Sequence, residues 1–183
     1  MDVKEAIDKR RAFRSLEKTE IDEKLIRELA KSASLSPSCF NKQPWRFVFV
    51  KGRDKLEELY SSLSKGNEWA YYSSMIIAVI SEKKLDCIVK SREYYLFDTG
   101  MASAFIILRA TEIGLVAHPI AGFDEDKAKK ILKIPDDMQL IAMIIVGKKS
   151  SKLNSELSDY QKKSEKERPE RLSFEKFGSI DEF

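Results

Sequence analysis

Three arginines in the segment Arg10-Arg11-Ala12-Phe13-Arg14 have the residue type and spacing to bind a phosphate. Arg10 and Arg14 are four residues apart, so they share one face of a helix that continues through this segment. Guanidinium groups suit a dianionic phosphoryl group because they donate paired, charge-assisted hydrogen bonds. A solvated basic helix end, stabilised by the helix dipole, explains the same pattern and from spacing alone is the commoner case.

A second candidate is the loop 36–45, with the sequence SPSCFNKQPW. Its small hydroxyl and amide side chains suit hydrogen bonding to a planar heterocycle. The composition alone favours the alternative, a loop that caps itself through Ser and Asn and is followed by a core tryptophan.

A third candidate is the turn 118–123, with the sequence HPIAGF. Gly122 permits a close approach of the backbone to a ligand, and Pro119 fixes the chain direction. An ordinary connection between a strand and a helix explains the turn equally well. His118 is the only histidine, so sites built on several histidines are excluded and a structural role is expected for it. Asp98 and the carboxylates at 124–126 are expected to cap helices or to be solvated, rather than to form an acid/base pair.

Composition places the chain among globular proteins with a heavily charged surface. It has 183 residues, of which 43% are hydrophobic and 34% charged, and a formal net charge of +3. Because the two signs are interspersed, a nucleic-acid partner is disfavoured. No apolar run approaches the roughly 20 residues of a spanning helix, and the N-terminus resembles no signal peptide. We therefore expect a cytoplasmic protein without a membrane partner.

The two cysteines, Cys39 and Cys87, are far apart and have no metal-ligand spacing. Such a pair is no disulfide framework, so reduced thiols are expected. An inert Cys39 is expected rather than a redox thiol.

The elements that must position these residues follow from hydrophobic periodicity. It predicts helices at 3–10, 22–33, 56–63, 90–113 and 124–132, and strands or extended segments at 45–50, 75–80, 115–121 and 140–146. The strand 75–80 is continuously apolar, as in a central strand buried on both faces. The segment 100–110 is apolar nearly all round, which indicates a helix in the middle of the core.

Residues 148–183 are mostly polar and cannot bury a core of their own. They are expected to form either a disordered tail or an arm that wraps a partner subunit. The whole chain, 1–183, is therefore expected to form a single α+β domain with an extended C-terminal arm.

The motifs RRxxR, SPSxxNxQPW and PIxGF, in this order and with a strand ending in VGK and a late arginine, resemble the nitroreductase family. The resemblance covers about residues 4 to 175, and SPSxxNxQPW is its most specific part. It implies a nitroreductase-like sandwich, with a mainly antiparallel central sheet flanked by helices. It also implies a homodimer in which the C-terminal arm is swapped onto the partner.

The resemblance implies an FMN site assembled from every candidate segment. Arg10, Arg11 and Arg14 would bind the phosphate and the edge of the flavin. The serine-rich loop would reach the flavin from the other subunit, and the turn would lie along the ring. The implied cofactor-binding residues are Arg10, Arg11, Ala12, Arg14, Pro37, Ser38, Cys39, Asn41, Asn67, Pro119, Ile120, Ala121, Gly122, Arg168 and Arg171.

The implied activity is electron transfer from NADH or NADPH through flavin N5 to a small acceptor such as a nitroaromatic or a quinone. No catalytic side chain and no metal is expected, because the flavin supplies the chemistry. An FMN-binding sensor or storage protein without turnover is the alternative. The chain departs from the family at Ala12, where many members have Ser, at Ala121, where some have Glu, and at Pro169, where a basic residue is frequent.

Overall fold

The computed structural model describes residues 1–183 as an α+β domain built on one antiparallel sheet. β6 (Leu115–Ile120), β7 (Gln139–Lys149), β3 (Met75–Ser81) and β2 (Arg46–Val50) lie side by side in that order. The short strand β1 (Leu16–Glu17) pairs with the end of β7. The expected fold class is confirmed.

β3 is the central strand, and all seven of its residues are buried. Side chains alternate across a strand, so Ile76, Ala78 and Ile80 pack into one core while Met75, Ile77 and Val79 pack into another. The prediction of a strand buried on both faces is confirmed.

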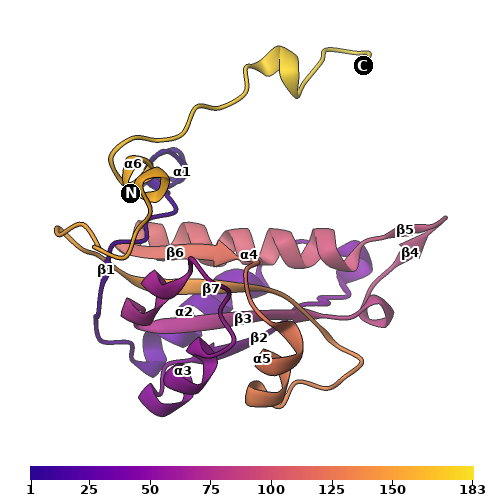
Figure 1. Cartoon of the computed structure of the whole chain (residues 1–183). Coiled ribbons are helices and arrows are strands. Elements are labelled where there is room, and N and C mark those ends of the chain that lie inside the picture. Colours follow the sequence, from indigo (N-terminus) through magenta and orange to yellow (C-terminus); the bar gives the residue numbers. More distant parts are fainter.

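Helices cover both faces of the sheet (Figure 1). The first core lies under α3 (Arg53–Tyr60), η2 (Glu68–Tyr72) and α5 (Glu125–Leu132). The second lies under α2 (Glu23–Ser34) and α4 (Tyr95–Glu112). These elements agree with the predicted ones apart from shifts at their ends and the additional η2.

The beginning of α4 and its burial differ from prediction. Residues 90–93 are not helical, because they belong to a hairpin of β4 (Ile88–Val89) and β5 (Arg92–Glu93). The helix is also not buried all round, since Phe97 is 63% exposed and Phe105 39% exposed. α4 therefore covers the sheet with one side and presents an apolar second side.

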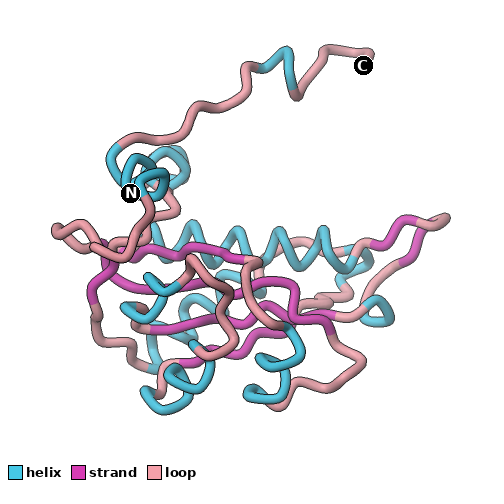
Figure 2. The backbone as a smooth tube through the Cα atoms, in the orientation of Figure 1, coloured by secondary structure: helices cyan, strands magenta, loops and turns pink.

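The C-terminal segment contains a helix that was not predicted, α6 (Asp159–Lys166), which lies beside α1 (Val3–Lys9) of the same chain (Figures 1 and 2). Beyond it, residues 167–183 extend away from the domain and contain the short η4 (Phe174–Lys176). None of the helices is both long and apolar enough to cross a bilayer.

Cys39 and Cys87 are joined by a disulfide with a Cα–Cα distance of 6.1 Å. The expectation of two reduced thiols is therefore wrong. The two residues are 48 positions apart, but β2 and β3 are antiparallel, with Arg46 opposite Ile80. The loop before β2 and the loop after β3 consequently meet at one end of the sheet.

Candidate cofactor site

The N-terminal arginines line a cavity of about 130 Å³. α1 ends at Lys9, and the backbone of Arg10 is already non-helical. The prediction that Arg10 and Arg14 share a helix face is therefore wrong, yet they still converge. The segment 10–14 is not helical, and Arg10, Arg11, Ala12 and Arg14 all line the cavity.

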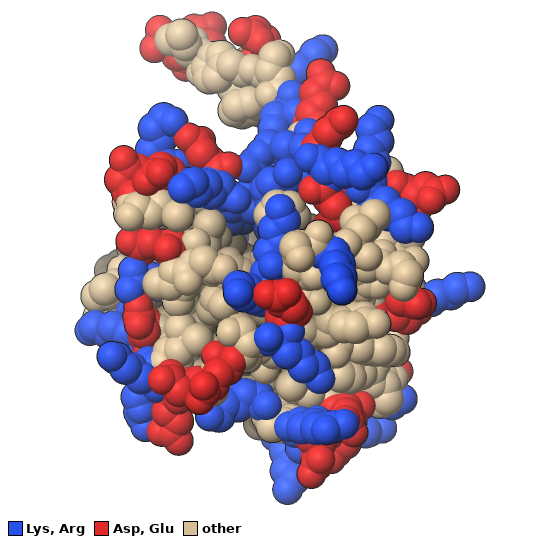
Figure 3. Space-filling view, turned by 90° about the vertical axis from the view of Figure 1, so that its left-hand side faces the viewer, with Lys and Arg blue, Asp and Glu red and all other residues tan.

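Two further arginines reach the same cavity from the C-terminal segment. Arg168 and Arg171 join Arg10, Arg11 and Arg14, and no carboxylate lines the cavity. The remaining lining residues are Ala12, Tyr160, Ser164 and Pro169. Lysine and arginine side chains gather on this side of the molecule, beneath the projecting tail (Figure 3).

Hydrogen bonds hold the tail over the N-terminal segment. Arg11 Nη2 donates to the carbonyl of Ser164 at 2.6 Å, and Arg168 Nη2 donates to the carbonyl of Arg10 at 3.0 Å. The buried carboxylate of Glu165 accepts hydrogen bonds from the backbone N–H of Arg14 at 2.7 Å and of Ser15 at 3.2 Å. α6 therefore fixes the backbone that carries the arginines.

The positive charge of this cluster is largely uncompensated. The side chains of Arg10, Arg14 and Arg171 make no hydrogen bond or ion pair within the chain. Burial lowers the pKa of Arg10, and the charges of Arg168 and Arg171 lower it further. Burial also lowers the pKa of Arg14, and Glu165 opposes that effect. Several guanidinium donors around a small cavity without an acid fit a dianionic phosphate.

His118 connects this cavity to the rest of the candidate site. Its Nδ1 donates to the carbonyl of Phe13 at 3.1 Å, and its ring stacks on Trp69 with centroids 4.7 Å apart. Burial lowers the pKa of His118 to about 4, so the ring is neutral at pH 7. The guanidinium of Arg14 lies 5.8 Å from the centre of the Trp69 ring. These contacts agree with the expected structural role of His118.

Asn67 and the turn after β6 lie together, as the candidate site requires. Asn67 Nδ2 donates to the carbonyl of Gly122 at 3.0 Å, and the backbone N–H of Ser64 donates to the same carbonyl at 3.0 Å. A Cβ at Gly122 would lie 2.5 Å from Asn67 Nδ2, so glycine permits this close approach. Pro119 and Ile120 are the last residues of β6, and Ala121 follows the strand; Ile120 is buried, whereas Pro119 and Ala121 are exposed.

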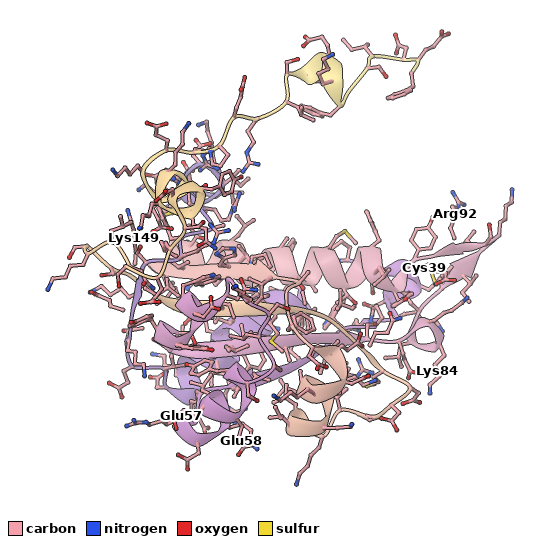
Figure 4. The ribbon with its side chains drawn as sticks, viewed as in Figure 1. Cys39, Glu57, Glu58, Lys84, Arg92 and Lys149 are labelled. Carbon is pink, nitrogen blue, oxygen red and sulfur yellow. A yellow bond between two sulfur atoms is a disulfide. The ribbon has the colours of Figure 1, made fainter.

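The loop residues Pro37, Ser38, Cys39 and Asn41 lie elsewhere in the chain. Cys39 is beside the β4–β5 hairpin, at the opposite end of α4 from Lys149 (Figure 4). Its backbone N–H donates to Oδ2 of Asp98, near the beginning of α4, at 2.7 Å. Asp98 is buried and neither caps its own helix nor is solvated, unlike Asp124, which caps α5 as expected. Within one chain, the structure does not bring this loop to the arginine cavity.

A sequence model described as the Nitroreductase family matches residues 7–72 and 67–148. The chain belongs to this family. It is 28% identical over 160 residues to a putative NADH dehydrogenase/NAD(P)H nitroreductase of Methanothermobacter thermautotrophicus, covering 80% of this chain and 77% of that relative. The family resemblance drawn from the motifs is thereby confirmed.

Solved structures of nitroreductases and related proteins have the same fold. A nitroreductase family protein from Clostridium novyi NT superimposes with a TM-score of 0.76 at 31% identity, covering 82% of this chain and 87% of that one. An oxidoreductase described as containing FMN superimposes with a TM-score of 0.82 at 26% identity, covering 97% and 91%. Membership of the nitroreductase family makes the chain an oxidoreductase.

Several residues of the candidate site were not predicted from the sequence. Tyr160 and Ser164 line the cavity, and Glu165 orders the backbone of Arg14. A local signal for their helix exists: Ser158 and Gln161 form a capping box at the beginning of α6. The pattern of Ser followed three residues later by Gln marks a helix start even where the helix is polar.

Proposed function

We propose that the chain is an FMN-dependent oxidoreductase that takes electrons from NADH or NADPH and passes them to a small acceptor, such as a nitroaromatic or a quinone. The cavity with five arginines and no carboxylate, in a chain of the nitroreductase family, carries this proposal. The relative from Methanothermobacter thermautotrophicus is named for NAD(P)H, and one structural neighbour is described as containing FMN.

In this proposal the arginine cavity holds the phosphate of FMN. Arg10, Arg11 and Arg14 donate from the N-terminal segment, where Ala12 leaves room, and Arg168 and Arg171 donate from the tail. Arg14 lies near Trp69, on which His118 stacks, and its positive charge would face the pyrimidine edge of the flavin. Held by these residues, FMN would supply the redox chemistry between the nicotinamide and the acceptor.

The turn residues Pro119, Ile120, Ala121 and Gly122 line the flavin ring in the proposed complex. Because the Gly122 carbonyl already accepts hydrogen bonds from Asn67 and Ser64, this backbone has a defined position before the cofactor binds. Because this turn is already ordered, less conformational entropy is lost when the cofactor binds. Asn67 then acts by holding the turn, and its amide oxygen remains free for the pyrimidine edge.

The proposed enzyme is a homodimer. Pro37, Ser38, Cys39 and Asn41 lie away from the arginine cavity of their own chain, so a second copy must supply them. The exposed apolar side of α4 offers a surface for that copy, because apolar patches of this kind rarely remain uncovered on monomers. Leu172, Phe174 and Phe177 on the projecting tail are exposed as well and suit an arm that packs on the partner.

The test is spectroscopic. Purified protein reconstituted with FMN is mixed anaerobically with NADH and, separately, with NADPH. Loss of the flavin absorbance with either nucleotide, followed by its return when a nitroaromatic or a quinone is added, is the expected result. A protein that binds FMN but keeps its spectrum with both nucleotides is a sensor or storage protein, and the proposed turnover is then wrong.

A further inference from the structure

The disulfide joins the proposed cofactor loop to a different part of the fold. Cys39 begins η1 (Cys39–Asn41), which lies within the loop, and Cys87 immediately precedes β4 of the projecting hairpin. Figure 4 shows the bond at the base of this hairpin. The cross-link is therefore the covalent attachment of the loop to the hairpin.

The loop needs such an attachment because its own backbone is unfavourable. Phe40, Asn41 and Gln43 have φ angles of 47°, 56° and 51°, in the left-handed region that side-chain-bearing residues avoid. Burial does not compensate, because Phe40 is 87% exposed. External contacts must therefore hold this conformation.

Few contacts hold the loop apart from the disulfide. Asp98 Oδ2 accepts from the Cys39 N–H at 2.7 Å, and Ser38 Oγ accepts from the Gln43 N–H at 3.0 Å. At the end of the loop, Ser81 Oγ donates to the carbonyl of Pro44 at 3.0 Å. Of these contacts, only the one with Asp98 anchors η1 itself to another element.

One carboxyl group, that of Asp86, lies beside the sulfur atoms. The two sulfurs and a carboxylate oxygen of Asp86 lie within 4.8 Å of one another. Burial raises the pKa of Asp86, and the neighbouring Asp98 raises it further. Acidic neighbours disfavour a thiolate, which is the species that attacks disulfides. Thiol–disulfide exchange at Cys39–Cys87 should therefore be slow, as in a structural disulfide, and not rapid, as at a catalytic thiol.

We propose that Cys39 and Cys87 form a thiol–disulfide modification site whose oxidised form holds residues 38–43 in the conformation that binds FMN. The reactants are a low-molecular-weight disulfide for closing and a low-molecular-weight dithiol for opening. This inference rests on the proposed function, since it adds redox control to the same cofactor site.

The closing reaction consists of two exchanges. One cysteine thiolate attacks the small disulfide, forms a mixed disulfide and releases one small thiolate. The second cysteine thiolate then attacks the protein sulfur of the mixed disulfide, closes the Cys39–Cys87 bond and releases the second small thiolate. The two cysteines lose two protons and two electrons, and the small disulfide takes them up and leaves as two small thiols.

The experiment compares the oxidised chain with the chain reduced by dithiothreitol. Free thiols should number zero and two, as counted by Ellman's reagent and by mass, because the chain has two cysteines. Reduction should speed amide hydrogen exchange in residues 38–43 and raise the Kd for FMN by about tenfold, because the loop must then be ordered on binding. Cys87→Ser is the matched variant: it should bind FMN like the reduced chain and should not respond to dithiothreitol.

Equal exchange rates and equal FMN affinities in the two states would overturn the proposal. Two free thiols with one equivalent of zinc in freshly purified protein would also overturn it, because Cys39, Asp86 and Cys87 would then be metal ligands. Absence of FMN binding in both states contradicts the proposed function and the cofactor part of this inference. In that case redox-dependent exchange at residues 38–43 still supports its structural part.

Discussion

Arg14 lines the arginine cavity and also lies near Trp69, next to the rest of the candidate site. It is half-buried, it makes no ion pair, and its guanidinium lies 5.8 Å from the Trp69 ring. Arg14→Ala removes only the side chain, and the backbone N–H of residue 14 still donates its hydrogen bond to Glu165. Loss of a charged hydrogen bond worth about 1.5–3 kcal/mol should raise the Kd for FMN by roughly 10- to 150-fold, measured by flavin fluorescence titration.

The control for this variant is Arg27→Ala, since Arg27 lies exposed on α2 and pairs only with Glu23. It should leave the Kd unchanged. An unchanged Kd in Arg14→Ala as well would remove Arg14 from the phosphate site.

His118 makes the stability of the apoprotein depend on pH. Its pKa of about 4 in the folded chain lies below the value of 6.5 expected when unfolded, so the unfolded state binds the proton more readily. The contribution of the neutral ring is fully present above pH 6.5 and is lost as the pH falls toward 4. The shift corresponds to about 3 kcal/mol, of which about 2 kcal/mol should be lost by pH 5.

Urea unfolding of the apoprotein between pH 7.5 and 5 measures this effect. His118→Asn removes the titrating ring while keeping a donor for the Phe13 carbonyl. Between pH 7.5 and pH 5, the free energy of unfolding of this variant should therefore fall by about 2 kcal/mol less than that of the unsubstituted chain. Parallel stability profiles for the two proteins would show that burial of His118 does not govern the acid response.

At the scale of elements, α6 is expected to hold the arginine segment largely through the side chain of Glu165, with the bond from Arg11 to the Ser164 carbonyl as a second link. Glu165 is 8% exposed, and its carboxylate accepts hydrogen bonds from the backbone N–H groups of Arg14 and Ser15. Glu165→Ala should release α6, speed hydrogen exchange over residues 159–166 and destabilise the chain by about 2 kcal/mol, because buried donors lose a charged partner. Glu167→Ala, two residues along at an exposed position, should change neither quantity. Unaltered exchange in Glu165→Ala would mean that other contacts dock the helix.

The elements predicted correctly are those with a strong local pattern. β3 is continuously apolar, and Asp22 and Asp124 cap their helices through their side chains. α6 was missed because its sequence is mostly polar, so its docking depends on Glu165 rather than on an apolar face. The disulfide was missed because sheet pairing, which sequence spacing does not reveal, brings Cys39 and Cys87 together.

The candidate site was predictable for a different reason. Taken singly, the arginine, loop and turn motifs each had an ordinary structural explanation, and their order along the chain identified the family. The structure adds the physical relation among them: Arg168 and Arg171 return to the N-terminal arginines, and Asn67 meets Gly122. Contacts between residues that are 55 to 160 positions apart in the sequence depend on the whole fold and cannot be derived from local periodicity.

At the scale of the whole molecule, the proposed site requires two chains, and the exposed side of α4 provides the test. Phe105 lines an apolar cavity of about 530 Å³ with Val3 and Leu35, and these two residues are 72% and 65% exposed. Phe105→Glu places a charge on this surface, so it should convert a dimer, seen by light scattering at micromolar concentration, into a monomer. FMN affinity should fall with it, because the loop at 37–41 would come from the partner. Tyr72→Glu, at a 46% exposed position in η2 on the other face of the sheet, should remain dimeric. A wild-type monomer that binds FMN with full affinity would show that one chain completes the site alone.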